Sequence, residues 1–170
     1  MTITGAGPLI EMFTDRLEIT NPGVPLINPD RFIDSAPRSR NESLASLMRR
    51  MRICEEQGTG IDKVVTSVEL FQLPPPDFRV EDHATRAVLY APRRFSAMTS
   101  DERIRACYQH AVLKYVSGGR MKNSTLRERF GIEGKNAAQV SNVIKQALSK
   151  SLIRPADQDK PQSAYVPFWA

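Results

Sequence analysis

A polar stretch without acidic residues carries the side chains of this chain that are best suited to recognition chemistry. No Asp or Glu occurs from Lys135 to Pro155. Asn and Gln amides pair in bidentate fashion with adenine in the major groove of DNA, and Lys reaches guanine or a phosphate. The stretch therefore predicts a DNA-reading helix at about 136–150. We expect contacts to DNA from Lys135, Asn136, Gln139, Asn142, Lys145 and Ser149.

Two more cations follow this helix in a segment that predicts a pair of short strands. The segment runs from Ile153 through a polar stretch, 156–162, to an apolar and aromatic end. Two strands around a polar tip are typical of the wing of a winged helix, and we expect Arg154 and Lys160 to lie near phosphates. Phe168 and Trp169 are interpreted as core residues that pack back on the helices.

The apolar pattern from residue 101 predicts the helices that position this face. A helical stripe begins at Ile104, and Gly118-Gly119 ends it. Thr125 with Glu128 has the spacing of a capping box and predicts the start of a second helix, which Gly131 ends. A third helix follows from about Asn136. Three helices joined by tight turns indicate a helix-turn-helix. The buried positions predicted for the three helices are Ile104, Cys107, Tyr108, Ala111, Val112, Tyr115, Val116, Leu126, Phe130, Ile132, Val140, Val143, Ile144, Ala147 and Leu148.

The first 91 residues predict a smaller mixed layer. Apolar runs at 9–13 and 16–20 flank Thr14-Asp15 and favour a hairpin, and helical patterns cover 41–53 and 61–71. A strand pair is expected at 78–80 and 87–90. The predicted fold class is α+β, a small mixed α/β N-terminal segment (1–91) followed, after a linker at 92–100, by a winged helix-turn-helix domain (101–170).

Charge is distributed unevenly between the two parts of the chain. Residues 1–95 hold 12 Lys and Arg against 13 Asp and Glu, whereas residues 96–170 hold 12 against 6. All the excess positive charge lies in the second part, which favours a polyanionic partner there. No apolar run approaches the length of a membrane span, and Cys54 and Cys107 lie far apart. We expect a soluble cytoplasmic protein with reduced cysteines, no metal site and no membrane partner.

The candidate catalytic residues are few. The segment Gly131-Ile-Glu-Gly-Lys-Asn136 lacks both the spacing and the hydroxyl residue of a phosphate-binding loop. His83 falls in an expected loop beside Asp82, and His110 falls off the apolar stripe of its helix, so both are interpreted as surface residues. The sequence thus predicts no enzyme, no catalytic residue and no cofactor.

Three motifs in the first half resemble a known family. They are 15–23 (DRLEITNPG), Arg40-Asn41 and 53–61 (ICEEQGTGI), and the ending 165–170 (YVPFWA) is also similar. Together they resemble the C-terminal half of bacterial transcriptional regulators of the Schlafen AlbA-domain, RecG-helicase-C-terminal-like family. The resemblance implies a domain similar to the histidine-kinase and gyrase type of ATP-binding fold. It makes Asn21, Gly23, Gly58 and Gly60 the nucleotide-binding candidates.

The nucleotide site that the resemblance implies is expected to be incomplete. The Asn-bearing helix that precedes these motifs in that fold is not found before the hairpin. Gly58 and Gly60 could offer N–H groups to an anion at a helix start, yet Asp62 adds a negative charge beside them. We interpret the first half as a non-catalytic relative of an ATP-binding fold.

The leading hypothesis is a transcription regulator that binds double-stranded DNA as a homodimer, since pairing two winged helices on adjacent half-sites raises specificity. Two alternatives stay open. One is a nucleotide-binding, ATPase-like regulatory fragment, and the other is a winged helix used for protein–protein interaction. A small-molecule or nucleotide effector of the first segment also stays open.

Overall fold

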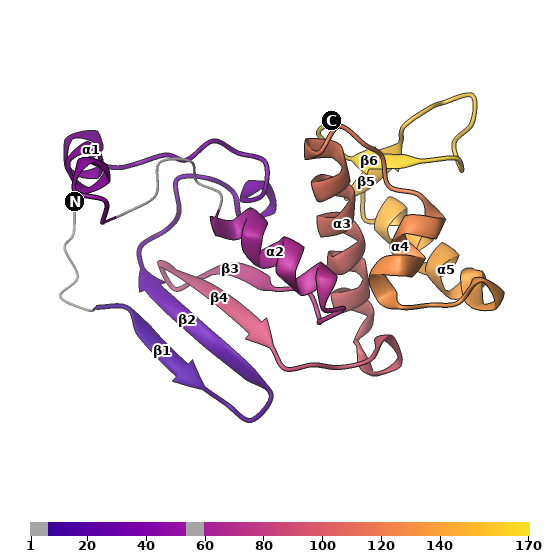
Figure 1. Cartoon of the computed structure of the whole chain (residues 1–170), viewed down its shortest axis with the longest axis horizontal. Coiled ribbons are helices and arrows are strands. Elements are labelled where there is room, and N and C mark those ends of the chain that lie inside the picture. Colours follow the sequence, from indigo (N-terminus) through magenta and orange to yellow (C-terminus); the bar gives the residue numbers. More distant parts are fainter. Residues whose placement is uncertain (1–6, 54–59) are drawn as a thin grey trace.

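The computed structural model describes residues 7–53 and 60–170. These residues form a four-stranded sheet, a two-stranded sheet, five α-helices and three short 3-10 helices (Figure 1). In chain order the elements are β1 (Leu9–Met12), β2 (Arg16–Pro22), η1 (Pro29–Arg31), α1 (Glu42–Arg50), α2 (Gly60–Leu70), β3 (Asp77–Glu81), β4 (Ala84–Tyr90), η2 (Phe95–Ala97), α3 (Ser100–Val116), α4 (Asn123–Phe130), η3 (Gly134–Asn136), α5 (Ala137–Ser149), β5 (Ile153–Pro155) and β6 (Tyr165–Pro167).

The larger sheet is antiparallel throughout and has the strand order β1-β2-β4-β3. The hairpin predicted around Thr14-Asp15 is formed, with Met12 opposite Leu17. Strand β2 continues into a seven-residue register with β4, from Arg16 opposite Tyr90 to Pro22 opposite Ala84. The predicted mixture of an antiparallel sheet and helices is therefore confirmed.

Helix α3 is the central element, and a capping box fixes its start. The Thr99 hydroxyl accepts a hydrogen bond from the Glu102 N–H (3.2 Å), and the Glu102 carboxylate accepts one from the Thr99 N–H (2.7 Å). The helix lies between α2 and the pair α4 and α5 in Figure 1. Buried positions along it include polar Gln109 and His110 as well as the predicted apolar positions from Ile104 to Val112. Helix α3 is therefore buried on more than one side, as expected for a helix that packs against neighbours on several sides. The last two positions of the predicted stripe, Tyr115 and Val116, are exposed (40% and 52%), so their assignment to the core was wrong.

Helix α4 begins two residues before the predicted capping box, so that prediction was wrong. Lys122 precedes the helix in an extended conformation, and Thr125 is the third helical residue. The Thr125 hydroxyl accepts a hydrogen bond from the Lys122 N–H (3.1 Å). At the other end Gly131 takes a left-handed conformation, φ 63°, and ends the helix as predicted.

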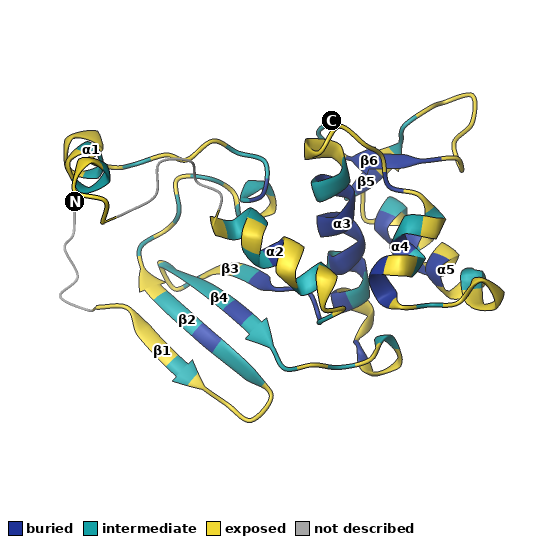
Figure 2. Ribbon diagram, viewed as in Figure 1, coloured by how far each residue is buried: buried dark blue, intermediate teal, exposed yellow. Residues whose placement is uncertain are grey.

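The smaller sheet, formed by β5 and β6, is the last element of the chain. Ile153 pairs with Pro167 and Pro155 with Tyr165, and Tyr165 also bridges to Met121 before α4. Figure 2 shows that burial is concentrated on α3, α4, α5 and β6, while α1 and β1 are mostly exposed. Seven residues of this core have 0% exposure: Cys107, Ala111, Val112, Met121, Leu126, Val140 and Ala147.

The two aromatic residues near the end of the chain differ in burial. The Trp169 indole N–H donates to the Tyr108 hydroxyl (3.2 Å), and the ring packs on the core as predicted. Phe168 is 45% exposed, so its assignment to the core was wrong. Its ring still stacks on Tyr108 at 6.2 Å between centroids, which covers only one face.

Three further expectations have different outcomes. Helix α1 forms within the predicted range 41–53, but its apolar residues Leu44 and Leu47 remain exposed. Cys107 is buried and free, whereas Cys54 lies outside the described residues. No helix in the described part of the chain combines the length and apolarity needed to cross a membrane.

The expected linker 92–100 contains η2 and packs on the helices beside it. The Arg93 guanidinium lies 2.6 Å from the Glu102 carboxylate, and the Phe95 ring meets the Phe130 ring at 4.8 Å. A division into domains at this segment stays a prediction.

Candidate nucleic-acid interface

A groove runs between helix α5 and the loop that joins β5 to β6. It has a volume of about 670 Å³, and the start of α4 also lines it. We call it the α5 groove. Its lining residues are uncharged except for one lysine: Asn123, Ala138, Ser141, Asn142, Ile144, Lys145, Leu148, Pro155, Pro161, Gln162 and Tyr165.

The sequence of α5 divides into two faces, and this division places the polar side chains in the groove. Val140, Val143, Ile144 and Ala147 are buried against the core. The remaining positions recur at intervals of three and four residues, so their side chains lie on one exposed face. No acidic residue lies on this face.

The structure brings two of the predicted DNA contacts together in the α5 groove, Asn142 and Lys145. Both are exposed, and no acidic group pairs with Lys145 in the described part of the chain. Gln139 is exposed on the flank of α5 that also carries Gln146, whose amide accepts a hydrogen bond from the Ser100 hydroxyl (3.0 Å). Gln139 therefore lies to one side of the groove.

The residues at the two ends of α5 are exposed outside the groove. Asn136 precedes α5, and its side chain forms no capping hydrogen bond. Lys135 pairs with the exposed Glu133 at 2.7 Å. The Ser149 hydroxyl donates to the main-chain oxygen of Gln146 (2.8 Å), an ordinary bond at the end of a helix.

The two cations predicted on the strand pair are also exposed. The Arg154 guanidinium donates to the main-chain oxygen of Ala170. Lys160 lies in the loop between β5 and β6, one residue before the groove residue Pro161. The same loop carries Asp157 and Asp159, neither of which lines the groove.

Three polar groove residues were missed from the sequence: Asn123, Ser141 and Gln162. The Asn123 amide donates to the Ser141 hydroxyl (3.0 Å), which joins the start of α4 to α5. The Arg127 guanidinium donates in turn to the Asn123 carbonyl oxygen (3.1 Å) and holds this amide in place. Asn123 was missed because the sequence pattern placed the start of this helix at Thr125 and not at Asn123.

Positive charge surrounds the groove beyond its single lysine. Arg120 and Lys122 precede α4 and are exposed, and within the described ranges they have no acidic partner. Lys150, just after α5, differs because it pairs with Asp101 at 2.7 Å, and this lysine lowers the pKa of the Asp101 carboxyl. Arg120, Lys122 and Lys145 are thus free cations near the place where α4 and α5 approach each other.

A buried polar cluster lies behind this surface and corrects the interpretation of His110. His110 is 3% exposed, with Nδ1 2.9 Å from Glu69 Oε2 and Nε2 3.0 Å from the Thr125 hydroxyl. Arg129 lies 3.7 Å from the same carboxylate and donates to the main-chain oxygen of Leu73 (2.7 Å). Burial lowers the pKa of Arg129, and Glu69 opposes that shift. The cluster ties α2 to α3 and α4, which is why a surface position was the wrong expectation.

The predicted nucleotide contacts lie at two places in the first half. Asn21 is an exposed residue of β2 paired with Thr85. Gly23 has φ 103°; its N–H donates to His83 (2.7 Å), and its carbonyl accepts from the Thr85 hydroxyl (2.7 Å). Gly60 is the first residue of α2, and Gly58 lies outside the described residues.

Comparison with known proteins places the first half in a family. Residues 5–89 match the family model described as "Putative ATP-dependent DNA helicase recG C-terminal". The chain belongs to this family. The match covers both hairpins of the larger sheet and helices α1 and α2, and it ends before α3 and the α5 groove.

The other comparisons add little to the RecG C-terminal family assignment. The solved structure of the DIP2311 protein from Corynebacterium diphtheriae is similar with a TM-score of 0.43 and 15% identity. The similarity covers 89% of this chain but only 29% of that one. No curated protein matches the chain.

The name of the RecG C-terminal family implies ATP, and the described residues do not fit its phosphates. Both main-chain groups of Gly23 already form hydrogen bonds to the hairpin of β3 and β4. Asp62, in the first turn of α2, has a buried carboxylate oxygen with no hydrogen-bond partner among the described atoms. Burial, with Asp34 nearby, raises the pKa of this carboxyl. A phosphate brought to this helix start would meet a carboxylate of which one oxygen already lacks a donor.

Proposed function

We propose that residues 100–170 form a winged helix that binds double-stranded DNA and that the chain acts as a transcription regulator. Helix α5 would enter the major groove, and the loop between β5 and β6 would be the wing. A major groove about 12 Å wide admits one α-helix, and α5, about 20 Å long, suits that role. The observation that carries the proposal is the α5 groove, where Asn142 and Lys145 lie beside Asn123 and Ser141 without an acidic residue.

The polar residues have distinct proposed roles. The Asn142 amide is suited to reading a base edge, and Lys145 is suited to a guanine or a phosphate. Arg120 and Lys122 at the approach to α4, with Arg154 and Lys160 on the wing, are suited to the phosphates that set orientation. Two copies on adjacent half-sites would give the specificity that a single helix lacks, so a homodimer on DNA is part of the proposal.

The charge of Lys145 provides the sharpest test of this function. Lys145→Glu should weaken binding to a fluorescein-labelled duplex of mixed sequence about tenfold or more in 50 mM salt, because a favourable contact becomes a repulsive one. Arg50→Glu, on exposed α1, makes the same charge change away from the groove and should change affinity about twofold or less. Fluorescence anisotropy measures both. Equal losses in the two variants would contradict a site in the α5 groove.

Nucleotide binding by residues 5–89 is a second candidate, favoured by the family match. Isothermal titration with Mg-ATP tests it independently of DNA. Saturable heat with a dissociation constant in the micromolar range would support it, and an Asp62→Asn variant that binds more tightly would identify the start of α2 as the phosphate site. The absence of any saturable heat would count against nucleotide binding by residues 5–89.

A further inference from the structure

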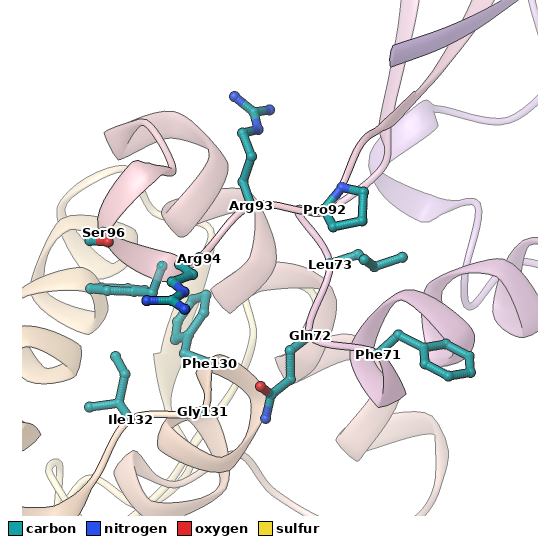
Figure 3. Close-up of a pocket in the computed structure, with 11 residues that line it drawn as sticks. Phe71, Gln72, Leu73, Pro92, Arg93, Arg94, Ser96, Phe130, Gly131 and Ile132 are labelled. Atoms are coloured by element: carbon teal, nitrogen blue, oxygen red, sulfur yellow. The ribbon is translucent and has the colours of Figure 1, made fainter. Parts of the chain in front are cut away.

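A second hollow lies at the end of α4, whereas the α5 groove lies at its start; the end of α2 and the segment before α3 also line this second hollow. Its volume is about 640 Å³. We call it the Arg94 hollow (Figure 3). The residues that matter for its chemistry are Gln72, Arg94, Phe95, Phe130 and Ile132. A volume of this size is in the range of sites that hold small organic molecules.

The hollow has one free positive charge. Arg94 is exposed, and within the described ranges no carboxylate pairs with it. Figure 3 shows its side chain directed toward Phe130 and Ile132. The neighbouring Arg93 extends in the other direction, where its guanidinium lies 2.6 Å from Glu102. Arg93 thus forms an ion pair within the fold, whereas its neighbour Arg94 has no acidic partner among the described residues.

The walls beside Arg94 are aromatic and apolar. The Phe95 and Phe130 rings meet edge to face, with centroids 4.8 Å apart and planes at 61°. Ile132 continues the apolar wall. On the far side the Gln72 amide N–H donates to the main-chain oxygen of Glu128 (3.2 Å), which leaves the amide oxygen as an acceptor. Aromatic rings prefer such edge and face contacts to other aromatic rings.

We propose that the Arg94 hollow binds a small planar aromatic carboxylate. The carboxylate would form a bidentate pair with the Arg94 guanidinium. The aromatic ring of the ligand would lie against Ile132 and against the parts of Phe95 and Phe130 that line the hollow. The Arg103 guanidinium already covers one face of Phe95, 4.4 Å from the ring centroid. The combination of an unpaired cation with an aromatic wall selects this class over a neutral apolar molecule or a bare inorganic anion. The proposal does not depend on DNA binding, so its test uses no DNA.

The test is a titration of the full chain with 2-naphthoate, followed through the ¹⁵N–¹H amide spectrum. Saturable shifts are expected at the amides of Gln72, Gly131 and Ile132, with a dissociation constant on the order of 1 mM or tighter. Arg94→Gln should weaken binding about tenfold, since it removes the charged partner. Arg50→Gln, an exposed arginine on α1, is the matched control and should bind as the parent does. The neutral comparator 2-naphthamide should bind more weakly than the acid.

Three results would each overturn the proposal. They are the absence of saturable shifts at those three amides, equal affinity in Arg94→Gln and the parent, and equal affinity for the acid and the amide. Because Arg94 is exposed and unpaired, its substitution leaves the core intact, and the same spectra report whether the variant is folded.

Discussion

Tyr108 is the residue that joins three separate parts of the chain. Its hydroxyl donates to the main-chain oxygen of Asp30 (2.6 Å) in η1 and accepts from the Trp169 indole (3.2 Å) near the end of the chain. The side chain is 4% exposed. Burial raises the pKa of Tyr108 to about 12. The neutral hydroxyl is therefore a structural link that the folded protein keeps protonated.

Removing this hydroxyl should destabilise the fold. Tyr108→Phe loses the bond to Asp30 and leaves the Trp169 N–H without this partner, so the free energy of unfolding should fall by about 1–2 kcal/mol at pH 7. Tyr115→Phe is the matched control, because Tyr115 is 40% exposed and meets Trp169 only edge to face, at 5.4 Å. Urea unfolding followed by circular dichroism measures both. A loss in Tyr115→Phe as large as in Tyr108→Phe would contradict the role of the hydroxyl.

The same residue gives a pH dependence with a defined sign. The folded state holds the Tyr108 proton more tightly than the unfolded state, whose tyrosine titrates near 10. Its contribution is therefore present below pH 10 and is lost as the pH rises toward 12. Stability of the parent should fall more steeply than that of Tyr108→Phe between pH 10 and 12. Parallel curves would show that this hydroxyl does not titrate with folding.

The burial of single residues could be predicted from the sequence only where the helical period alone determines which face of a helix is buried. The period identified Val140, Val143 and Ala147 as buried, and hence the opposite face of α5 as exposed. It failed at His110, because a period predicts one apolar stripe and α3 is packed on more than one side. The partner that buries His110 is Glu69 of α2, and its position depends on the tertiary fold.

At the scale of elements, the turn after α4 is held by a close approach between two chain segments. Gly131 has φ 63°, and a Cβ there would lie 2.5 Å from Gln72 Oε1. Gln72 also donates to Glu128 at the end of α4 (3.2 Å). The end of α2 thus contacts the turn that leads into α5; the left-handed backbone favours glycine there, and a Cβ would have to displace the Gln72 side chain.

A pair of glycine substitutions separates these two requirements. Gly131→Ala should lower the free energy of unfolding by about 2–3 kcal/mol, whereas Gly118→Ala should cost about 1 kcal/mol. Gly118 has φ 77°, yet no atom lies within 4 Å of its Cβ position, so it reports backbone strain alone. In a Gln72→Ala background the cost of Gly131→Ala should approach that of Gly118→Ala. Urea unfolding measures each value, and no reduction in that background would refute the close contact.

The order of the elements was largely predictable from the sequence, and their exact starts were not. Glycine at 131 ends α4 as predicted because its left-handed conformation is a local property. The start of α4 was misplaced because Thr125 has the spacing of a cap but bonds backwards to Lys122 and to His110. A capping pattern read from the sequence is ambiguous when the hydroxyl side chain has several possible hydrogen-bond partners.

At the scale of the whole molecule, the two halves have different chemistry. Residues 5–89 belong to the RecG C-terminal family, while the excess positive charge lies after residue 95. The polar face of α5 was predictable because it lies on one continuous helix. The α5 groove was not, because Asn123, Gln162 and Tyr165 reach it from other elements. Only the tertiary fold places them beside Asn142 and Lys145.

The salt dependence of DNA binding tests the central claim most directly. If the cations around the α5 groove neutralise phosphates, the logarithm of the association constant for a duplex should fall linearly with the logarithm of salt concentration. About three to five such contacts predict a slope of about −3 to −5 between 50 and 200 mM salt. Fluorescence anisotropy with a labelled duplex gives this slope. No binding at 50 mM salt, or binding with a slope near zero, would contradict DNA recognition by this chain.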